Sequence, residues 1–465
     1  MNTPGSGTPT WAARLAGHLI AAYRAPVPEA ILHRAAVHLL DSIACAAGAV
    51  DAEPVTAARK VVAGSGPAVA TVFFGGTRAS TVDAILVNGT AVRFLDANDI
   101  FIGAGPGGHP SDNIVVALAA GEEVGARGRD VLTAIALSYE LVHRIRTLLY
   151  RPSRQAHHWH EVSLSATVAA AVAGLLYGLD EYQLTQAITI GTAKGYALKE
   201  IRRGAISAMK GSGNALVARD GVLAAQLARA GLTGPPEIFE GESGLFTAFG
   251  LQPAADTLDR LTAPPQWAIT GASIKAFPGL GTSQAAVHAA ARLAADHGRF
   301  APAAVKRVTI RLADSAYTRD YRNLDERRRP TTRETADHSI QFLVAVALLD
   351  GAVTPGHYDR MAWTDAGVEA VMAVTEIIAD PGLNCDTERA FPAIVEVDTG
   401  VAVVRHEIRA TPGSPESPWE RVDVVEKFLR FDRIGLGRTT IERIADEVMA
   451  LPDAADITSL TALLR

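Results

Sequence analysis

The sequence predicts a mainly α protein with an α/β (α+β) second domain, that is, a large all-helical domain and a smaller domain that contains strands. Three observations lead to this prediction. Helical apolar stripes run almost without interruption from Trp11 to about Arg260, apolar and polar residues alternate after about residue 265, and helical periodicity returns after a linker rich in Pro, Gly and Ser, Thr411–Pro418. The expected division is a helical domain over residues 1–268, an α/β domain over residues 269–410, and C-terminal helices over residues 411–465 that return to the helical domain.

Length and composition restrict the class of protein before any motif is considered. The 465 residues are 48% hydrophobic, which supplies enough apolar surface for two domains with buried cores. The net charge is −6 and there is no long basic run, so we expect no nucleic acid partner. The longest largely apolar run, Leu164–Leu179, is short for a membrane span and rich in alanine, so we expect a core helix and no membrane partner.

Cysteine usage and the N-terminal residues indicate a reduced, cytoplasmic setting. The chain has only two cysteines, Cys45 and Cys385. They are too few to stabilise a chain of this size through disulfides, or to supply the three thiolates of an aconitase-type iron–sulfur cluster. Met1–Pro9 is polar and rich in Gly, Thr and Pro, which predicts a flexible leader rather than a targeting signal.

The first part of the chain contains apolar stripes with the helical period, most of them bounded by Gly, Pro, Asp or Asn. Asp180 and Glu181 place acidic side chains in the first turn of one helix, which suits the helix dipole. No repeat of fixed period is present, which argues against a solenoid. The expected helices are Pro26–Ala47, Thr81–Phe94, Asn113–Val124, Asp130–Leu149, Ser163–Tyr177 and Asp180–Ala193.

The second part contains the strand signals. Val305–Leu312 alternates apolar and polar residues with β-branched side chains, which is typical of a half-buried strand. Ile394–Val397 and Val401–Ile408 predict a hairpin whose three-residue loop, Asp398–Gly400, ends in a glycine. The expected helices here and beyond are Ser283–His297, Ser339–Leu349, Val368–Ile378, Trp419–Phe431 and Thr440–Met449.

The first segment suited to chemistry is a loop that carries Asp96, Asp99 and His109, with a glycine-rich stretch before His109. Loops held by rigid helices commonly carry catalytic groups, and an imidazole with a carboxylate can transfer protons. A structural interpretation is that Ser111 or Asp112 caps the next helix. The two interpretations are compatible, because capping leaves His109 available for catalysis.

The second segment runs from Arg202 through Lys210 to Asn214. Small residues at a helix start can turn backbone N–H groups toward an anion, and Lys210 adds charge. The order of glycines and lysine is not that of a P-loop, and by itself the segment favours a solvated basic turn. One observation favours a functional role for this segment. The chain has seven lysines against 37 arginines, so Lys210 and Lys275 are candidates for positions that require a compact or deprotonatable ammonium group, which arginine could not supply.

The third segment, His157–His160, contains three histidines. We expect no metal there, because no second cluster of Cys, Asp or Glu with ligand spacing lies nearby; one histidine serves in acid/base chemistry or carboxylate binding, or else all three are surface residues. His33, His38 and His143 lie on helical stretches and are expected to be ordinary, partly buried residues. The chain has no Gly-x-Ser-x-Gly elbow and no dinucleotide fingerprint after a strand, which argues against serine hydrolysis and hydride transfer.

At these segments the chain resembles the MmgE/PrpD family, which includes 2-methylcitrate dehydratase and cis-aconitate decarboxylase. The resemblance runs from about residue 30 to residue 430, nearly the whole chain, in the order of the family. The stretches that carry it are LDANDIF with GGHPSDN (95–113), WHEVSLSAT with LLYGLDEYQLTQAITIGT (159–192), AMKGSGNALVARDGVLAAQLARAGLTGP (208–235), SIKAFP (273–278), RPTTRETADHSIQFLVAVALLDG (329–351) and GSPESPWERVDVVEKF (413–428).

The resemblance implies a helical domain with an α/β lid, a homodimer, and no metal or organic cofactor. It implies an active site between the domains, with a tyrosine of the lid that we identify as Tyr321, next to the similar Tyr317. The catalytic residues it implies are Asp96, His109, His160, Lys210, Lys275 and Tyr321, and the expected substrate-binding residues are Asn98, Ser111, Ser212 and His158.

Three departures from the family pattern affect the substrate more than the fold. Ile100 stands where many members have threonine. Gly281-Thr282-Ser283-Gln284 stands where many relatives have a histidine before Ser-Gln. The glycine-rich stretch before His109 is also unusual.

The resemblance implies a cofactor-independent dehydratase acting on a small citrate-like polycarboxylate. Lys210, Lys275 and His160 would stabilise the charge that accumulates on a carboxylate, and either His109 or Asp96 would take or give the proton. The same groups would serve a decarboxylase of the cis-aconitate type, or an isomerase or epimerase of a related dicarboxylate. A non-catalytic carboxylate-binding protein is the alternative of another class, favoured by Ile100 and Thr282.

Overall fold

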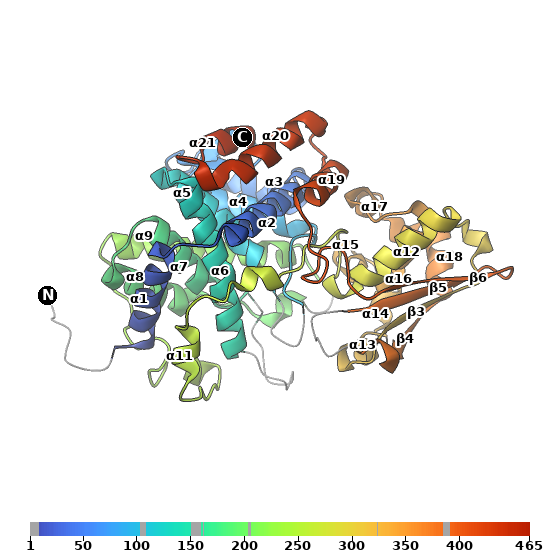
Figure 1. Cartoon of the computed structure of the whole chain (residues 1–465), viewed down its shortest axis with the longest axis horizontal. Helices are drawn as coiled ribbons and strands as arrows, with labels where there is room; N and C mark the ends of the chain where they lie inside the picture. The colour runs from blue at the N-terminus through green and yellow to red at the C-terminus, as the bar shows by residue number, and fades with distance from the viewer. Residues whose placement is uncertain are drawn as a thin grey trace.

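The computed structural model describes residues 9–102, 108–149, 160, 162–202, 206–322, 324–384 and 391–465. Two hydrophobic cores organise them (Figure 1). The first core draws its residues from Ala12 to Ile274 and again from Val424 to Leu464, and the second from Ala276 to Val397. The predicted fold class, mainly α with an α/β second part, is confirmed.

Six helices of the first core begin and end close to the predicted bounds, and short helical turns lead on to the second core. A two-stranded antiparallel hairpin, β1 (Ala70–Val72) with β2 (Thr77–Ala79), also belongs to this part and was not predicted. The helices are α1 (Trp11–Arg24), α2 (Glu29–Ala47), α3 (Glu53–Val62), α4 (Thr81–Phe94), α5 (Ile114–Val124), α6 (Gly128–Leu149), α7 (Ser165–Leu176), α8 (Glu181–Lys194), α9 (Met209–Arg229), α10 (Leu245–Ala248) and α11 (Thr257–Leu261). The six that were predicted are α2 and α4 to α8.

Local side-chain bonds explain several of these boundaries. The Ser80 side chain accepts a hydrogen bond from the backbone of Asp83 and starts α4. Asp180 and Gln183 form a reciprocal capping box at the start of α8, so the acidic first turn also satisfies backbone donors.

Helix α2 is long and apolar enough to cross a membrane by length and composition, and 83% of that window is buried inside the protein. It carries the buried polar side chains of His38 and Asp41 at its centre. Both side chains bind partners in neighbouring segments, so the described structure uses α2 as a core helix.

The second core packs helices on a four-stranded sheet of order β4-β3-β5-β6, in which only the β3–β4 pair is parallel. Helix α12 lies on β5 and β6 and packs against α16 (Figure 1). The strands are β3 (Arg307–Ala313), β4 (Thr375–Asp380), β5 (Ala393–Asp398) and β6 (Val403–Ile408). The helices are α12 (Gln284–His297), α13 (Ala316–Tyr321), α14 (Asp325–Arg328), α15 (Arg333–Ala336), α16 (Ile340–Asp350), α17 (Pro355–Asp359) and α18 (Ala366–Ala373).

Two predictions for this part need correction. The expected helix Val368–Ile378 ends with α18 at Ala373, and its last residues belong to β4, because the β-branched side chains there pair in parallel with β3 at the sheet edge. The hairpin β5–β6 is confirmed, but its loop has four residues, 399–402, since Asp398 pairs with Val403. Gly400 adopts the left-handed conformation inside this loop, with φ +77°.

The C-terminal helices α19 (Arg421–Phe431), α20 (Gly437–Ala450) and α21 (Thr458–Leu463) contribute to the first core, and α19 and α20 pack on α2 (Figure 1). A buried ion pair joins the two ends of the chain: Lys427 Nζ lies 2.5 Å from Asp41 Oδ1. The same ammonium donates to the backbone oxygen of Ala97 at 2.7 Å. This contact ties the loop after α4 to the C-terminal helices.

Replacing Lys427 by Met tests this tie. Asp41 would remain as a buried charge without its cation, so the free energy of unfolding should fall by about 3–5 kcal/mol in chemical denaturation. The exposed Lys306 offers the matched control, and Lys306→Met should change stability by less than about 0.5 kcal/mol. Adding Asp41→Asn to Lys427→Met should recover part of the loss, and strictly additive losses would contradict the pairing.

Candidate functional site

The site is centred on Asp96, in the loop that follows α4. Asp96 is 3% exposed and has a φ of +50°, a left-handed conformation that is rare outside glycine and is tolerated best by Asn and Asp. Strained backbone of this kind clusters at functional sites. The conformation is held on the backbone side by Lys275, whose Nζ donates to the carbonyl oxygen of Asp96 and to that of Gly279.

Three cationic side chains bind the Asp96 carboxylate. Its Oδ1 lies 2.6 Å from Lys275 Nζ and 2.9 Å from an Arg93 nitrogen, and its Oδ2 lies 3.1 Å from Lys210 Nζ. Burial alone would raise the pKa of Asp96, but Lys275, Lys210 and Arg93 more than offset it and hold that pKa well below its ordinary value. Asp96 is therefore ionised throughout the physiological pH range.

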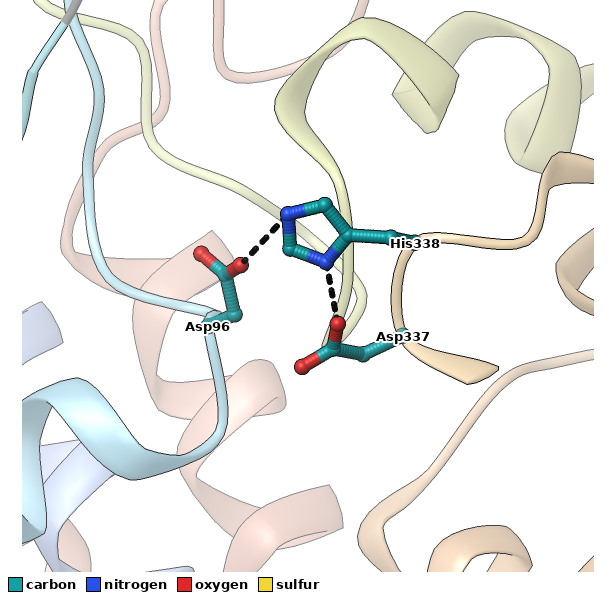
Figure 2. A group of neighbouring side chains, drawn as sticks. All are labelled: Asp96, Asp337 and His338. Carbon is teal, nitrogen blue, oxygen red and sulfur yellow. Dashed lines mark hydrogen bonds and ion pairs between the residues drawn. The ribbon is translucent and has the colours of Figure 1, made fainter. Parts of the chain in front are cut away.

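Lys210, near the start of α9, also binds the second core. Its Nζ lies 3.0 and 2.9 Å from the two carboxylate oxygens of Asp337 and 3.2 Å from His338 Nδ1. Figure 2 shows Asp96 facing His338, which in turn contacts Asp337. Lys210 is 5% exposed, so the expectation of a solvated basic turn at this residue is wrong.

The cluster carries an excess of positive charge. The guanidinium of Arg333 lies 3.8 Å from Asp337 and 3.9 Å from the centre of the Phe94 ring, which places it at the edge of the same group. Burial, followed by the charge of Lys210, lowers the pKa of His338 to about 4, so this imidazole is neutral. Four cations thus surround two carboxylates.

Asp96, Asp337 and His338 are also close enough to one another to ligate a metal ion. The Lys210 ammonium lies within 3.2 Å of all three, where such an ion would sit. This donor set therefore fits a lysine cation rather than a metal.

Lys275 is 1% exposed and lies between Asp96 and the second core. Burial lowers its pKa, and the repulsion of Arg93 and Lys210 acts in the same direction, while Asp96 opposes both. Lys210 and Lys275 are therefore brought together on one carboxylate, although they lie 65 positions apart in the chain.

His109 is placed by the backbone of the same loop. Its Nδ1 lies 2.6 Å from the carbonyl oxygen of Asp99. Because a carbonyl oxygen can only accept, Nδ1 carries the proton of the neutral imidazole and Nε2 is the basic nitrogen. The Asp99 carboxylate is fixed by His38 Nδ1 at 3.1 Å and by the backbone N–H of Ser111. His38 is thus a buried support of the loop rather than an ordinary helical residue.

His160 has the opposite tautomer. Its Nδ1 accepts a hydrogen bond from the backbone N–H of Val162 at 3.2 Å, so Nε2 carries the proton in the neutral ring. The residue is buried, and its backbone N–H donates to Ala197. One histidine thus offers a basic nitrogen and the other an N–H donor.

A small polar hollow lies beside His109. Val162, two residues after His160, and Asn214, one helical turn after Lys210, both line it. The hollow therefore adjoins the segments of both histidines and the helix that carries Lys210. Its lining consists of His109, Asp112, Asn113, Val142, Arg146, Val162, Ser165 and Asn214.

Asn98 and Ser111 hold the two halves of the loop together, since Asn98 Nδ2 donates to Ser111 Oγ at 2.9 Å. The predicted helix capping by Ser111 or Asp112 is wrong. Helix α5 has Asn113 at its N-cap without a side-chain cap, and Asp112 instead accepts from Asn214. Ser111 and Asp112 lie in a short 3-10 turn, Pro110–Asn113, that precedes the helix, so their side chains bind neighbouring segments instead of capping it.

Ser212 is half-buried on α9, two residues after Lys210, so it faces nearly the opposite side of the helix from Lys210. His158 lies outside the described residues. The Tyr321 hydroxyl donates to the backbone oxygen of His338 and accepts from Ile340 N at 3.0 Å, so it holds the turn that carries His338. The hydroxyl of Tyr317 lies 3.2 Å from Thr282 Oγ1, beside one of the departures from the family pattern.

Sequence reasoning missed four members of this site: Arg93, Arg333, Asp337 and His338. A signal for the last two was present, because TADHS was among the stretches that carried the resemblance. Their role depends on the contacts of Asp337 and His338 with Lys210, which lies 127 and 128 positions away in the chain, and no local pattern encodes such contacts.

Two family models match the chain in sequence. The MmgE/PrpD N-terminal domain matches residues 13–257, and the MmgE/PrpD C-terminal domain matches residues 277–451.

Curated relatives carry two kinds of enzyme name. The cis-aconitate decarboxylase-like protein oryM of Aspergillus oryzae is 24% identical over 94% of each chain. The cis-aconitate decarboxylase of Homo sapiens is 25% identical over 82% of this chain and 79% of its own length. The 2-methylcitrate dehydratase of Cupriavidus necator is 28% identical over 64% of this chain and 62% of its own length.

The neutral state of His338 predicts how stability depends on pH. Unfolded histidine has a pKa near 6.5, above the folded value of about 4, so only the unfolded chain binds this proton between those pH values. Stability is therefore complete above about pH 6.5 and falls on acidification toward pH 4, by about 3 kcal/mol in total for this group. The depressed pKa values of Asp96 and Asp337 act in the same direction below about pH 4.

Chemical denaturation at pH 7, 6 and 5 tests this dependence. Between pH 7 and pH 5 the parent protein should lose about 2 kcal/mol more than His338→Gln. Burial also lowers the pKa of His288, to about 4, and the comparison with the variant removes its contribution. The exposed His297 provides the control, and His297→Gln should keep the parent slope. Equal slopes in the parent and His338→Gln would show that the pKa of His338 is the same in the folded and unfolded states, which would contradict the prediction.

Proposed function

Because this chain belongs to the MmgE/PrpD family, we propose that it is a lyase that removes water from a small citrate-like polycarboxylate. The observation that carries the proposal is the excess of cations at the junction of the two cores: Arg93, Lys210, Lys275 and Arg333 surround two carboxylates. Arg333 is partly exposed, and the three other cations leave one positive charge in excess of the two buried carboxylates. A buried charge in excess is costly unless an anionic ligand completes it. A di- or tricarboxylate supplies that charge.

In the proposed binding mode, a substrate carboxylate becomes a new partner of the Lys210 ammonium. Its ammonium has three N–H donors, and the carboxylates of Asp96 and Asp337 accept from it in this structure. A substrate carboxylate must therefore share or replace the contact with Asp337. Lys210 belongs to a helix of the first core and Asp337 to a segment of the second, so a small separation of the cores exposes the ammonium.

Proton removal is assigned to His109. Asp96 is a poor base because its cations hold its pKa far below neutrality. The basic Nε2 of His109 follows from the bond between Nδ1 and Asp99, and an imidazole has a pKa suited to proton transfer near pH 7. This divides the roles that the sequence left open: Asp96 fixes the lysines and His109 takes the proton.

The negative charge that develops on the carboxylate next to the reacting carbon is stabilised by Lys210 and Lys275. Removing one such fixed donor typically raises the barrier by about 2.7–4 kcal/mol. His160 presents its Nε2–H as a hydrogen-bond donor to a second carboxylate. His109 gives the proton that it has taken to the departing hydroxyl, which leaves as water. No step of this scheme uses a metal or an organic cofactor.

Decarboxylation is the second candidate. It is favoured by the relatives that carry that name, which match 94% and 82% of this chain, against 64% for the dehydratase of Cupriavidus necator. The same cations would stabilise the carbanion left when carbon dioxide departs. Isomerisation or epimerisation shares the proton transfer without loss of either product. Assembly as a homodimer and a cytoplasmic location stay predictions.

The test is a panel of tricarboxylates with two readouts, ultraviolet absorbance of a new double bond and release of carbon dioxide. Dehydration should produce the absorbance without the gas, and His109→Gln should lower kcat by about 10²- to 10⁴-fold while the fold is retained. His297→Gln should keep the parent rate. Gas release at the rate of substrate loss would make the protein a decarboxylase. Ligand binding without exchange of the substrate proton in deuterated water would make it a binding protein.

Lys210→Met should abolish turnover and also lower the free energy of unfolding by about 3–5 kcal/mol, because Asp337 and Asp96 lose a buried cation. An alanine at this position would have the same defect, so loss of activity there needs a stability measurement beside it. Pairing Lys210→Met with Asp337→Asn removes one charge of each sign. The pair should regain stability without regaining turnover; regained turnover would rule out a direct role for Lys210.

A further inference from the structure

Arg333 is a cation of the site whose hydrogen-bond donors are only partly used. Its Nη1 lies 3.8 Å from Asp337 Oδ2, which is too far for a hydrogen bond, whereas Lys210 Nζ lies 2.9 Å from the same oxygen. The Arg333 Nη2 atom is buried and has no hydrogen-bond partner among the described residues. A buried N–H group without an acceptor is costly, so the arrangement indicates that Arg333 gains an acceptor in another state of the protein.

Two aromatic rings hold the Arg333 guanidinium in this place. Its central carbon lies 3.9 Å from the centre of the Phe94 ring, at the end of α4, and 5.0 Å from the centre of the Tyr358 ring, on α17. Such rings attract a cation through their faces and do not use its N–H donors. The guanidinium is therefore fixed beside Asp337 while its Nη2–H groups remain able to bind a carboxylate.

Arg333 and Asp337 belong to the same part of the fold. They lie four positions apart across the short helix α15, a spacing that puts two side chains on one helix face, and this segment helps to build the second core. Lys210 belongs to α9, a helix of the first core. A small separation of the cores therefore moves Lys210 away from Asp337 and leaves Arg333 beside it.

Asp337 needs a cation whether or not Lys210 is in place. Its side chain is 0% exposed, and a buried carboxylate that loses its cation is strongly destabilising. His338 also contacts the Asp337 carboxylate, but its imidazole is neutral and supplies no charge. Among the described residues that form ion pairs with Asp337, this leaves Arg333 as the second source of positive charge.

We propose that Arg333 is a positioning residue, whose guanidinium takes over the Asp337 carboxylate when Lys210 binds a substrate carboxylate. A movement of about 1 Å would shorten the present contact to the length of a charged hydrogen bond. Because Asp337 stays paired, the Lys210 ammonium is released to the substrate at little cost in free energy. The inference rests on the proposed function for the identity of the ligand, but not for the exchange of partners.

A test without ligand uses Lys210→Met, which removes the ammonium from Asp337 as substrate binding would. Chemical denaturation gives the equilibrium constant for folding. Arg333→Gln should lower this constant by about fivefold or less in the parent, where Lys210 holds Asp337 and the aromatic contact is the main loss. In Lys210→Met the same change should lower it by about 50-fold or more, because Asp337 then loses its remaining cation. Equal losses in the two backgrounds would overturn the proposal.

The second test measures the Kd of citrate, 2-methylcitrate and cis-aconitate by calorimetry at pH 7. Arg333→Gln should weaken binding by about 10- to 100-fold, and parent affinity in this variant would contradict the exchange. In an Asp337→Asn background the same change should alter the Kd by about twofold or less, because a neutral amide needs no cation. A full effect in that background would show that Arg333 binds the ligand itself. The control is Arg329→Gln, which removes an exposed charge four positions earlier and should keep the parent Kd.

The two tests separate this inference from the proposed function. If none of the acids binds to the parent protein, the proposed function fails, and the folding measurements still decide on the exchange. Turnover of an acid together with equal folding losses in the two backgrounds overturns the exchange alone. If Lys210→Met does not fold, the Kd measurements decide. If only its combination with Arg333→Gln does not fold, the combined loss exceeds the sum of the single losses, as the proposal requires.

Discussion

The buried carboxylate of Asp96 is the constraint on which the rest of the site depends. It forms ion pairs with Lys275, Arg93 and Lys210. Lys210 forms a further ion pair with Asp337 in the second core. Such a cluster is stable only when every charge finds a partner, because an isolated buried ion is strongly destabilising. The two cores are therefore joined by the electrostatic contact between Lys210 and Asp337. Lys427 also stabilises the loop that carries Asp96, because its ammonium donates a hydrogen bond to the backbone oxygen of Ala97.

The surroundings of the ionisable groups in this part of the chain determine their protonation states. Asp96 stays ionised and His338 stays neutral near pH 7, so neither changes its protonation state in the physiological range. His109 and His160 differ in tautomer because one ring meets a carbonyl oxygen and the other a backbone N–H. A site with fixed cations, one basic imidazole and one imidazole N–H contains the parts that proton removal beside a carboxylate requires.

Two of the departures from the family pattern lie in segments that adjoin the charged centre. Ile100 pairs through its backbone with Ser273, two residues before Lys275. The Thr282 hydroxyl lies 3.2 Å from that of Tyr317. A Cβ on Gly281, the neighbour of Thr282, would lie 3.0 and 3.3 Å from two side-chain carbons of Ile100, so the two segments are closely packed although they are 181 positions apart in the chain. The ion pairs of Asp96 are made by other side chains.

The sequence by itself determined the fold class, the family and most helix bounds, because apolar periodicity and capping residues act within a few positions. It also selected Asp96, His109, His160, Lys210 and Lys275 through their motifs, but it could not show which of them meet. It misjudged Val368–Ile378, where pairing with β3 outweighed local helical preference, and the capping role of Ser111 and Asp112. Only the tertiary structure decided that Lys210 is buried and that Asp337 and His338 lie against its ammonium. It also decided which ring nitrogen is basic in His109. Those properties are set by burial and by hydrogen-bond partners from distant segments, and the burial and partners exist only once the two cores have packed together.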